Sequence, residues 1–352
     1  MTLEKARREI DSIDDNIVEL LNERAKKIKA VAAEKRKSNA PVFDPARESE
    51  VLGKLTSKAK DFPSKGIRSV FTEIFSFSRA MQQPLTVSFL GPKATFTHIA
   101  AIKKFGSQPD FKPEDSIAEV FDSVEKGKSS YGVVPVENSM EGSVNHTLDM
   151  FLDSNLSVVG EISLEVRHHL LSKYRLKEIK KVYSHPQAFA QCRKWLNRNL
   201  RGVELVEVSS TSKGAESAKL YLHSAAIASE LAAKEFGLEI VDSSIQDSGA
   251  NVTRFLVIGM GKPNRTGKDK TSILFSVRNK PGALFKALKA FHDFNINMTK
   301  IESRPAKTKA WDYVFFVDFQ GFAEDEAVKK SLGELEKNCG FMKILGSYPE
   351  EA

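Results

Sequence analysis

The 352-residue chain contains only two cysteines, Cys192 and Cys339, which lie far apart and form no Cys-x-x-Cys motif. Reduced thiols, as in cytosolic proteins, are therefore the default expectation. Long apolar runs are also missing, so no segment is expected to cross a membrane. The first residues, MTLEKARREIDS, lack the apolar stretch of a secretory signal. We therefore expect a cytoplasmic protein that does not associate with membranes.

Several motifs that define other classes of protein are absent. Gly259 and Gly261 begin a Gly-x-Gly pattern, but Asn264 stands where a dinucleotide fingerprint requires its third glycine. There is no Gly-x-Ser-x-Gly turn, and no set of His, Cys and Asp residues has the spacing of metal ligands. The adjacent His168 and His169 would face opposite ways on a strand, so we interpret them as structural residues. We expect neither a metal ion nor an organic cofactor.

The positive charge, 53 Lys and Arg residues against 46 Asp and Glu residues, is spread along the chain. No basic block alternates with aromatic residues, so nucleic-acid binding is disfavoured. A surplus of positive charge also suits anionic metabolites. The chain is too long for one ordinary core, and two or three domains are expected.

The first segment, from Leu3 to about Lys37, has no proline or glycine and is predicted to form one long helix. Its apolar residues recur every three to four positions and form a seam. Arg7, Arg24 and Lys35 lie on the same seam. A cation on a core-facing stripe is costly unless an anion neutralises it. One such side chain could extend its charged end into water, but three of them favour an anionic ligand.

Distances along this helix indicate a partner chain. A helix of this length spans roughly 50 Å, more than a segment of about 84 residues can cover. Arg7 and Arg24 are about 25 Å apart along the axis, whereas Arg24 and Lys35 are about 16 Å apart. One small ligand can contact the second pair but not the first. We infer that Arg7 serves the site of a partner chain in an intertwined homodimer.

The rest of the helical segment supplies further polar groups. A helix start is favoured at Asp44, which is followed by proline, and another helix is predicted from about Ser64 to Gln83. Ser78 and Gln82 fall on the buried face of that helix, where a glutamine needs a partner from the protein or from a ligand. The segment resembles the all-helical chorismate mutases through the polar residues Arg7, Arg24, Lys35, Asp44, Arg47, Glu48, Ser78 and Gln82.

This resemblance implies that these residues bind chorismate. Arg7 from the partner subunit, Arg24 and Lys35 would neutralise its two carboxylates. The Claisen rearrangement needs no acid, base or metal, because holding the compact conformer and stabilising charge on the ether oxygen suffice. Lys35 and Gln82 are the implied catalytic donors to that oxygen, and Glu48 takes the ring hydroxyl.

From residue 85 onward the pattern changes to a buried strand, a polar loop and then a helix. Strands that end in Ser, Thr or Asn are predicted at 87–90, 131–136, 181–183 and 203–208. In an open α/β sheet such loops converge on one crevice, and helix N-termini there suit carboxylates. Ser and Thr are ordinary N-caps, but four such loops together favour an anion-binding cleft. Residues 225–236 are predicted to form a helix and residues 238–241 a strand.

Another polar stretch, Asp247–Gly259 (DSGANVTRFLVIG), ends in a buried strand. Thr253 and Arg254 stand at the mouth of that strand, where a hydroxyl can donate a proton and a guanidinium can bind a carboxylate. A solvated arginine at a strand edge is the alternative interpretation. With the motifs GPKATFTHIAA, VVPVENSMEGSV, YSHPQAFAQC and SSTS, this stretch resembles the prephenate dehydratases along nearly all of residues 85–264.

The second resemblance implies a two-lobed α/β fold similar to that of periplasmic binding proteins, with the substrate between the lobes. Thr253 is the implied catalytic proton donor to the departing ring hydroxyl of prephenate, and loss of carbon dioxide aromatises the ring. Ser209 stands where some relatives have a glutamate, which puts an acidic role at that position in question. The implied prephenate-binding residues are Thr95, Asn138, Ser184, Gln191, Thr211, Thr253 and Arg254.

Residues 264–270 form a polar linker, and the remainder is predicted to fold in the order βαββαβ, which is the ferredoxin-like arrangement. The strands are expected at 272–277, 298–303, 311–319 and 342–345, and the helices at 283–294 and 325–338. The stretches NKPGAL and ESRP resemble the two phenylalanine-binding parts of the ACT regulatory domain. The implied effector-binding residues are Gly282, Ala283, Leu284, Glu302, Ser303 and Arg304.

The sequence thus predicts a multidomain chain with an all-α unit over 1–84, an α/β unit over 85–264 and an α+β unit over 271–352. The resemblances imply an isomerase and lyase of phenylalanine biosynthesis that converts chorismate to prephenate and prephenate to phenylpyruvate. They also imply inhibition by L-phenylalanine and a homodimer or larger homo-oligomer. A non-enzymatic amino-acid sensor is the alternative, but it would have no use for the cations of the first helix. A mutase fused to a dehydrogenase is disfavoured by the missing glycine fingerprint.

Overall fold

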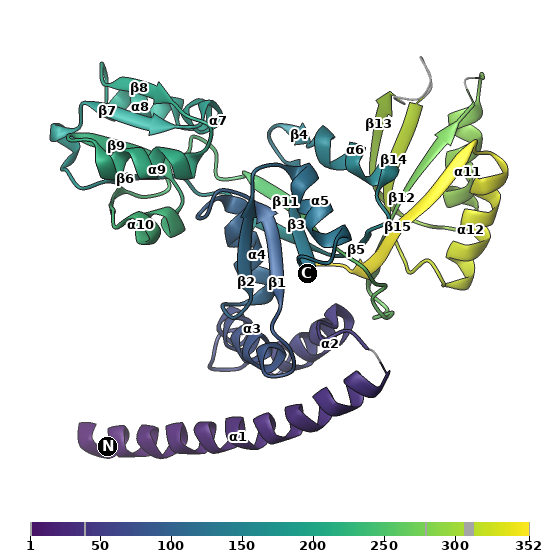
Figure 1. The fold of residues 1–352 in the computed structure, drawn as a ribbon, viewed down its shortest axis with the longest axis horizontal. Helices are drawn as coiled ribbons and strands as arrows, with labels where there is room; N and C mark the ends of the chain where they lie inside the picture. The colour runs from purple at the N-terminus through teal and green to yellow at the C-terminus, as the bar shows by residue number, and fades with distance from the viewer. Residues whose placement is uncertain (1, 39, 279, 306–312, 352) are drawn as a thin grey trace.

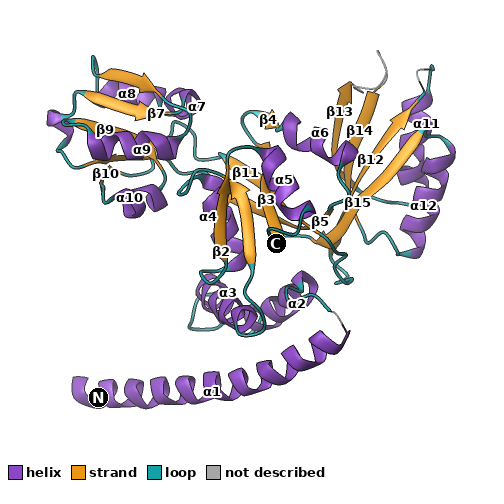
Figure 2. Ribbon diagram, in the orientation of Figure 1, coloured by secondary structure: helices purple, strands orange, loops and turns teal. Residues whose placement is uncertain are grey.

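A computed structural model describes residues 2–38, 40–278, 280–305 and 313–351. Of the sequence predictions, Asn279 and the start of the strand expected from Trp311 lie outside the described residues. The chain forms a helical N-terminal part, a two-lobed α/β part and a C-terminal α+β part (Figures 1 and 2). Within the described ranges, no helix is both long and apolar enough to span a membrane.

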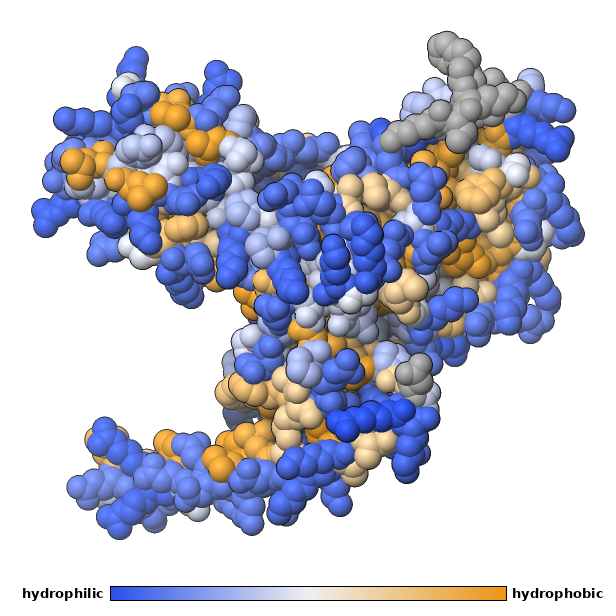
Figure 3. Space-filling model, viewed as in Figure 1, coloured by the Kyte–Doolittle hydropathy of each residue, from blue (hydrophilic) through white to orange (hydrophobic). Residues whose placement is uncertain are grey.

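The predicted long helix is confirmed as α1 (Leu3–Ser38), and Figure 1 shows most of its length standing clear of the rest of the chain. Its apolar seam is exposed to solvent: the exposed fractions of Ile10, Ile13 and Ile17 are 56%, 57% and 49%. Figure 3 shows apolar side chains along this helix. A single chain therefore leaves the predicted core-facing stripe of α1 uncovered.

Two shorter helices, α2 (Pro45–Thr56) and α3 (Ser64–Ala80), complete the helical part. The predicted start of α2 is confirmed, since the Asp44 side chain caps it and a proline takes its first position. Phe43, just before the cap, packs in the core of the α/β part with its ring centroid 4.9 Å from that of Phe105. The α2 and α3 pair is therefore anchored to the α/β part, whereas most of α1 is not.

Each lobe of the α/β part has its own sheet. The strands are β1 (Thr86–Leu90), β2 (Asp110–Glu114), β3 (Tyr131–Asn138), β4 (Gly142–Ser143), β5 (Ser157–Glu165), β6 (His169–Ser172), β7 (Lys181–Ser184), β8 (Glu204–Glu207), β9 (Ser224–Ala228), β10 (Glu239–Asp242) and β11 (Val252–Gly259). The first lobe has the order β2-β1-β3-β11-β5, with β4 paired to β3, and the second has β10-β6-β9-β7-β8. The chain thus enters the second lobe after β5 and returns to the first through β11, which carries Thr253.

Helices pack against both sheets (Figure 2). They are α4 (Phe96–Phe105), α5 (Ile117–Glu125), α6 (Asn145–Asp153), α7 (Pro186–Gln191), α8 (Arg193–Asn199), α9 (Thr211–Leu220) and α10 (Glu230–Phe236), with a 3-10 turn at Leu176–Glu178. The helix predicted over 225–236 is wrong in its first half, because residues 224–228 form β9. Every residue of β9 is buried between β6 and β7, so packing in the sheet overrides the helical preference of alanine. The strand predicted at 238–241 is confirmed as β10.

The C-terminal part has the predicted βαββαβ order. Its elements are β12 (Asp269–Val277), α11 (Ala283–Asp293), β13 (Met298–Pro305), β14 (Tyr313–Gln320), α12 (Glu326–Lys337) and β15 (Phe341–Pro349). The sheet order β13-β14-β12-β15 is that of a ferredoxin-like fold. The predicted linker ends too late, because residues 269 and 270 already belong to β12 and the Asp269 carboxylate accepts a hydrogen bond from the Thr266 hydroxyl at 2.7 Å.

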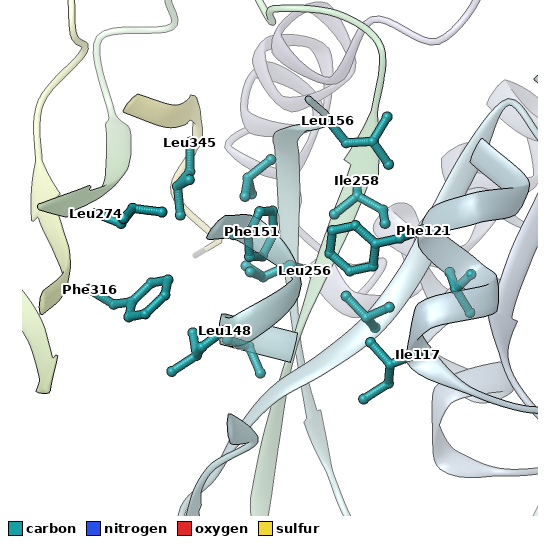
Figure 4. Close-up of a cluster of buried hydrophobic side chains, with 14 of the residues drawn as sticks. Ile117, Phe121, Leu148, Phe151, Leu156, Leu256, Ile258, Leu274, Phe316 and Leu345 are labelled. Atoms are coloured by element: carbon teal, nitrogen blue, oxygen red, sulfur yellow. The ribbon is translucent and has the colours of Figure 1, made fainter. Parts of the chain in front are cut away.

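The C-terminal sheet shares a hydrophobic core with the first lobe. Leu274, Phe316 and Leu345 of the C-terminal part lie in one buried cluster with Phe151 and Leu256 of the α/β part (Figure 4). Burial of such side chains is worth about 1.5–3 kcal/mol each. The C-terminal part is therefore held to the α/β part by packing, not only by a linker.

Candidate active sites

A cavity of about 270 Å³ lies between the two lobes of the α/β part. Strands β3 and β11 and the start of α4 line it from the first lobe, and α7 and the start of α9 line it from the second. The structure thus gathers most of the predicted prephenate-binding residues in one place. Those that line the cavity are Thr95, Asn138, Gln191, Thr211 and Thr253.

Thr253 and Asn138 lie opposite each other on β11 and β3. The Asn138 amide donates to Thr253 Oγ1 at 2.8 Å and to Asn251 Oδ1 at 2.8 Å. Its own oxygen accepts from the backbone N–H groups of Met140 and Glu141, which fixes the orientation of the amide. Because Thr253 accepts the amide bond, its own hydrogen is left to donate, and no acceptor takes it among the described residues. The hydroxyl is therefore arranged as a donor toward the cavity.

Asn251 and His168 also line the cavity, although sequence reasoning did not assign them to the site, and they extend this network toward the second lobe. Gln191 Oε1 accepts from the Asn251 amide at 2.9 Å and lies 2.8 Å from His168 Nε2. Since an amide oxygen only accepts, His168 carries its proton on Nε2. Burial lowers the pKa of His168, which favours the neutral ring. The polar spacing of Asn251 and Thr253 was a signal for Asn251. His168 had been interpreted as a structural residue, but it lines the cavity.

Two helix N-termini border the cavity. Thr95 caps α4 by accepting from the backbone N–H of His98 at 3.4 Å, and Ser210 caps α9, whose first residue is Thr211. None of the described lining residues is lysine or arginine. The free backbone N–H groups at the positive ends of these two helices, together with the hydroxyl, amide and imidazole groups of the lining, are therefore available to bind carboxylates.

Two predicted prephenate-binding residues do not line the cavity. Ser184 is fully buried and donates its hydroxyl to the Ile227 carbonyl at 2.7 Å. Arg254 turns away because adjacent residues of a strand face opposite sides of the sheet, and Thr253 faces the cavity. Its guanidinium instead binds Glu161 and residues of the C-terminal part. We therefore no longer assign a substrate carboxylate to Arg254.

The helical part brings a second group of predicted residues together. The guanidinium of Arg24 on α1 donates to the hydroxyl of Ser78 on α3, and it lies 5.8 Å from the centroid of the Phe75 ring. Burial lowers the pKa of Arg24, and the nearby Glu48 opposes that shift. The Gln82 amide donates to the Ser78 carbonyl at 3.0 Å, while its buried oxygen has no partner in the described part of the chain. The unpaired oxygen needs a hydrogen-bond donor, and the second N–H of the amide has no acceptor among the described residues, so the Gln82 side chain can still donate to a ligand.

Sequence reasoning missed Arg79, which is 3% exposed. It pairs with Glu48, donates to the Phe105 carbonyl at 2.5 Å, and lies 5.5 Å from the centroid of the Phe43 ring. Burial raises the pKa of Glu48, and Arg79 opposes that shift. Arg79 follows Phe75 by four positions, so helical spacing already placed it on the buried face of α3.

The remaining predicted mutase residues lie at the edge of this group or away from it. Lys35 donates to two backbone carbonyls just before the Asp44 cap, at 2.8 and 3.0 Å. Arg47 is exposed and pairs with Glu50 at 2.6 Å. Arg7 is exposed near the free end of α1, about 25 Å along the helix from Arg24. One chain therefore brings the other predicted mutase residues together without Arg7 and Arg47.

The two predicted effector-binding stretches lie at one end of the C-terminal sheet. Val314 of β14 pairs with both Arg304 on β13 and Ser276 on β12, so β12 and β13 end side by side around β14. Gly282 adopts φ 76° and leads directly into Ala283, the first residue of α11. A glycine suits that left-handed turn and leaves the helix N-terminus open to a ligand.

Two effector-stretch side chains contact the first lobe. Glu302 accepts from the Ser143 hydroxyl at 2.8 Å, and Arg304 lies 3.3 Å from Asp149. Ser303 alternates with them on β13 and points to the other face. The strand predicted to sense an effector is therefore in direct contact with the first lobe of the α/β part.

The fold and the two groups of residues define a metabolic enzyme for small anionic substrates, with a helical unit, a two-lobed α/β unit and a regulatory unit. Family models match in the same order: type II chorismate mutase over residues 6–83, prephenate dehydratase over 87–263 and the ACT domain over 271–337. The chain belongs to the bifunctional chorismate mutase/prephenate dehydratase family.

Individual relatives support this assignment. The chain is 49% identical over 354 residues to the bifunctional chorismate mutase/prephenate dehydratase of Aquifex aeolicus, covering 99% of this chain and 98% of the relative. It is 33% identical over 368 residues to the bifunctional enzyme of Escherichia coli, covering 98% and 95%. Among solved structures, the prephenate dehydratase of Arthrobacter aurescens in complex with L-Phe has a TM-score of 0.70 at 32% identity, covering 76% of this chain and 90% of that one.

Proposed function

We propose that the helical part converts chorismate to prephenate, that the interlobe cavity converts prephenate to phenylpyruvate, and that L-phenylalanine inhibits the chain through its ACT domain. The observation that carries the proposal is the Asn138–Thr253 hydrogen bond, which leaves a threonine proton free in a cavity bordered by helix N-termini. The test is to incubate the purified chain with chorismate and to follow prephenate and phenylpyruvate with and without L-phenylalanine. Prephenate that accumulates without phenylpyruvate would contradict the second activity.

In the dehydratase step, Thr253 donates a hydrogen bond to the ring hydroxyl of prephenate as it leaves. The hydroxyl departs as water with the proton of Thr253, which the threonine regains from solvent after the reaction. The bond between the ring and its carboxylate breaks to release carbon dioxide, and the electron pair of that bond aromatises the ring. The N–H that Asn138 donates to Thr253 Oγ1 stabilises the negative charge that develops on that oxygen. The N-termini of α4 and α9 hold the carboxylates without a cationic side chain.

In the mutase step, Arg24 and Lys35 hold the carboxylates, and the Lys35 ammonium and the Gln82 amide donate to the ether oxygen. We propose that the exposed seam of α1 is covered by a second copy of the chain, which also brings its Arg7 to the site. The seam is apolar, and a stripe of this length exposed on one chain marks an interaction surface.

The proposed cytoplasmic location fits the two cysteines, which are free, and burial raises the pKa of the Cys192 thiol to about 12.

Gln82→Glu is expected to make the mutase reaction acid-dependent. A glutamine donates at every pH, whereas a typical glutamate is ionised at neutral pH and then opposes the charge on the ether oxygen. The variant should lose activity at neutral pH and regain it as the pH falls toward about 4.5, while the unaltered chain shows no such rise. Chorismate consumption across this range is the measurement. Parallel profiles for the two proteins would show that Lys35 alone stabilises the ether oxygen.

Removing residues 271–352 is expected to abolish dehydratase activity together with phenylalanine inhibition. A polar linker such as the one predicted at residues 264–270 would make the regulatory domain separable. The deletion would however expose Leu256 and Phe151, which the C-terminal sheet β13-β14-β12-β15, called the ACT sheet below, covers. A matched pair of substitutions tests how much the shared core contributes to stability. Phe316→Ala, in the shared core, should lower the free energy of unfolding by about 3–5 kcal/mol, whereas Phe285→Ala, on the surface, should change it by less than about 0.5 kcal/mol. Thermal denaturation measures both. A truncated chain with full dehydratase activity would contradict the need for this core.

A further inference from the structure

Arg254 lies beside Thr253 on β11, but its side chain points to the opposite face of the sheet, toward the ACT domain. Its Nε donates to Glu161 at 2.8 Å, its Nη1 to Asp318 at 2.6 Å, and its Nη2 to the Tyr348 hydroxyl at 3.1 Å. The arginine side chain is 15% exposed. All three of its nitrogens are therefore engaged, and binding a substrate carboxylate would first require breaking buried bonds.

The groups that hold Arg254 are fixed within the ACT sheet. Asp318 is on β14 and Tyr348 on β15, and Ser272 of β12 joins them: its hydroxyl donates to Asp318 at 2.5 Å and lies 2.8 Å from the Tyr348 hydroxyl. Tyr348 is completely buried. A displacement of the ACT sheet therefore carries the partners of Arg254 with it.

The neighbouring strand repeats this arrangement. In the β3–β11 ladder, Asn138 pairs with Thr253 and Glu137 pairs with Arg254. Glu137 lies 3.0 Å from the ammonium of Lys300 on ACT strand β13, and 3.7 Å from Arg254. Thr253 and Asn138 form the hydrogen-bonded pair in the cavity. The residue next to each of them in sequence, Arg254 or Glu137, forms an ion pair with the ACT sheet.

Buried charge makes these contacts costly to break one at a time. Glu161 lies between Arg254 and Lys270, at 2.8 Å from each, and its side chain is 3% exposed. Removing one partner of a buried ion pair leaves the other without compensation. The ion pairs among Arg254, Glu161, Lys270 and Asp318 are therefore expected to stay intact and to move together with the ACT sheet.

We propose that Arg254 is a positioning residue that couples the ACT sheet to the Asn138–Thr253 pair, and that it is not a ligand of prephenate. The inference rests on the proposed function, because it takes the cavity as the dehydratase site and the ACT domain as the effector site. Lys300 and the predicted effector residues Glu302 and Arg304 are every second residue along β13, so their side chains lie on the same face of the strand. An effector that shifts the ACT sheet carries the ion-pair partners of Glu137 and Arg254 with it, and so moves the backbone of β3 and β11 beside Asn138 and Thr253. Phenylalanine then inhibits to the extent that it binds this displaced arrangement more tightly than the arrangement without the displacement.

The test uses the full-length chain with three substitutions: Arg254→Lys, Asp318→Asn and Tyr348→Phe. The last removes only a hydroxyl and is the variant least disturbing to folding. The measurements are dehydratase kcat, KM for prephenate, and the L-phenylalanine concentration that halves the rate, with mutase activity as the check of folding. In the first two variants kcat should fall at least about tenfold, while KM changes less than about threefold. In all three the half-inhibiting concentration should rise at least about fivefold.

Lys103→Gln is the matched control, because Lys103 also joins the first lobe to the C-terminal part, at 3.0 Å from Glu351, and its polar contacts do not include β11. Its kinetics should be unchanged. A rise in KM of about tenfold at constant kcat in Arg254→Lys would overturn the proposal and assign Arg254 to substrate binding. Unchanged inhibition in Asp318→Asn and Tyr348→Phe would overturn the coupling.

Failure of the proposed function gives a different result from failure of this inference. In the first case the unaltered chain does not convert prephenate, or does not respond to L-phenylalanine. If only the response is missing, the division of the effect between kcat and KM still tests the positioning role. In the second case the unaltered chain is inhibited and the Arg254, Asp318 and Tyr348 variants behave as it does.

Discussion

Replacing Thr253 with alanine is expected to lower the dehydratase kcat by about 10²–10⁴-fold while the mutase rate stays unchanged. The change removes the hydroxyl whose proton the Asn138 bond leaves free, and it creates no large cavity. The helical part is anchored to the α/β core through Phe43, so an unchanged mutase rate indicates that the fold is retained. Phenylpyruvate formation from prephenate and prephenate formation from chorismate are the two measurements.

Two conservative variants separate the hydroxyl from the rest of the site. Thr253→Ser keeps the donor and should retain part of the activity. Asn138→Asp keeps the size of the side chain but replaces the amide donor by a carboxylate that only accepts. The Thr253 hydroxyl would then donate to the carboxylate and not to the substrate, so this variant should be nearly as inactive as Thr253→Ala. An active Thr253→Ala chain would place the proton donor elsewhere.

Mixing an Arg7→Ala chain with an Arg24→Ala chain is expected to restore mutase activity that each lacks alone. Each substitution removes a charge-assisted contact worth about 1.5–3 kcal/mol, or roughly 10- to 150-fold in rate. In a mixed dimer one site receives Arg24 from the first chain and Arg7 from the second, and the other site receives neither. Random exchange makes about half of the dimers mixed, so about a quarter of the unaltered activity should return.

The control for this experiment is dehydratase activity, which both variants should retain because the interlobe cavity contains neither arginine. Exchange of subunits should be verified with two tags of different size. Verified mixed dimers that stay inactive would show that Arg7 serves its own chain, or no site at all. Arg47→Ala is a useful companion, because Arg47 is exposed and pairs with Glu50, and its loss should change the mutase rate less than the loss of Arg24.

Features with a regular period were predictable from the sequence. The long helix followed from 36 residues without proline or glycine, and the order of the C-terminal elements followed from alternating runs of strand and helix character. The strand β9 was mispredicted because its alanines favour helices, and only its place between two buried strands decides otherwise. Local preference cannot reveal that position.

The site residues divide along a similar line. Thr253 and Asn138 were predicted, since polar residues at strand ends are local signals. Arg254 was placed in the same cavity although the alternation of a strand sends it to the other face, and its partners Asp318 and Tyr348 lie 64 and 94 positions away. Contacts at that distance depend on how the domains pack, which no local pattern records. The same holds for Arg79, whose partner Phe105 belongs to the next domain.

The uncovered seam of α1 makes the two activities depend differently on dilution. The residues that line the cavity between the lobes come from one polypeptide, whereas in the proposed dimer the helical site receives Arg7 from a second one. By mass action, the rate per chain of the rearrangement should fall when the protein is diluted below the dissociation constant of the pair, and that of the dehydration should not. At low expression the same gene product would thus act mainly as a dehydratase, and the amount of protein would set the ratio of the two rates.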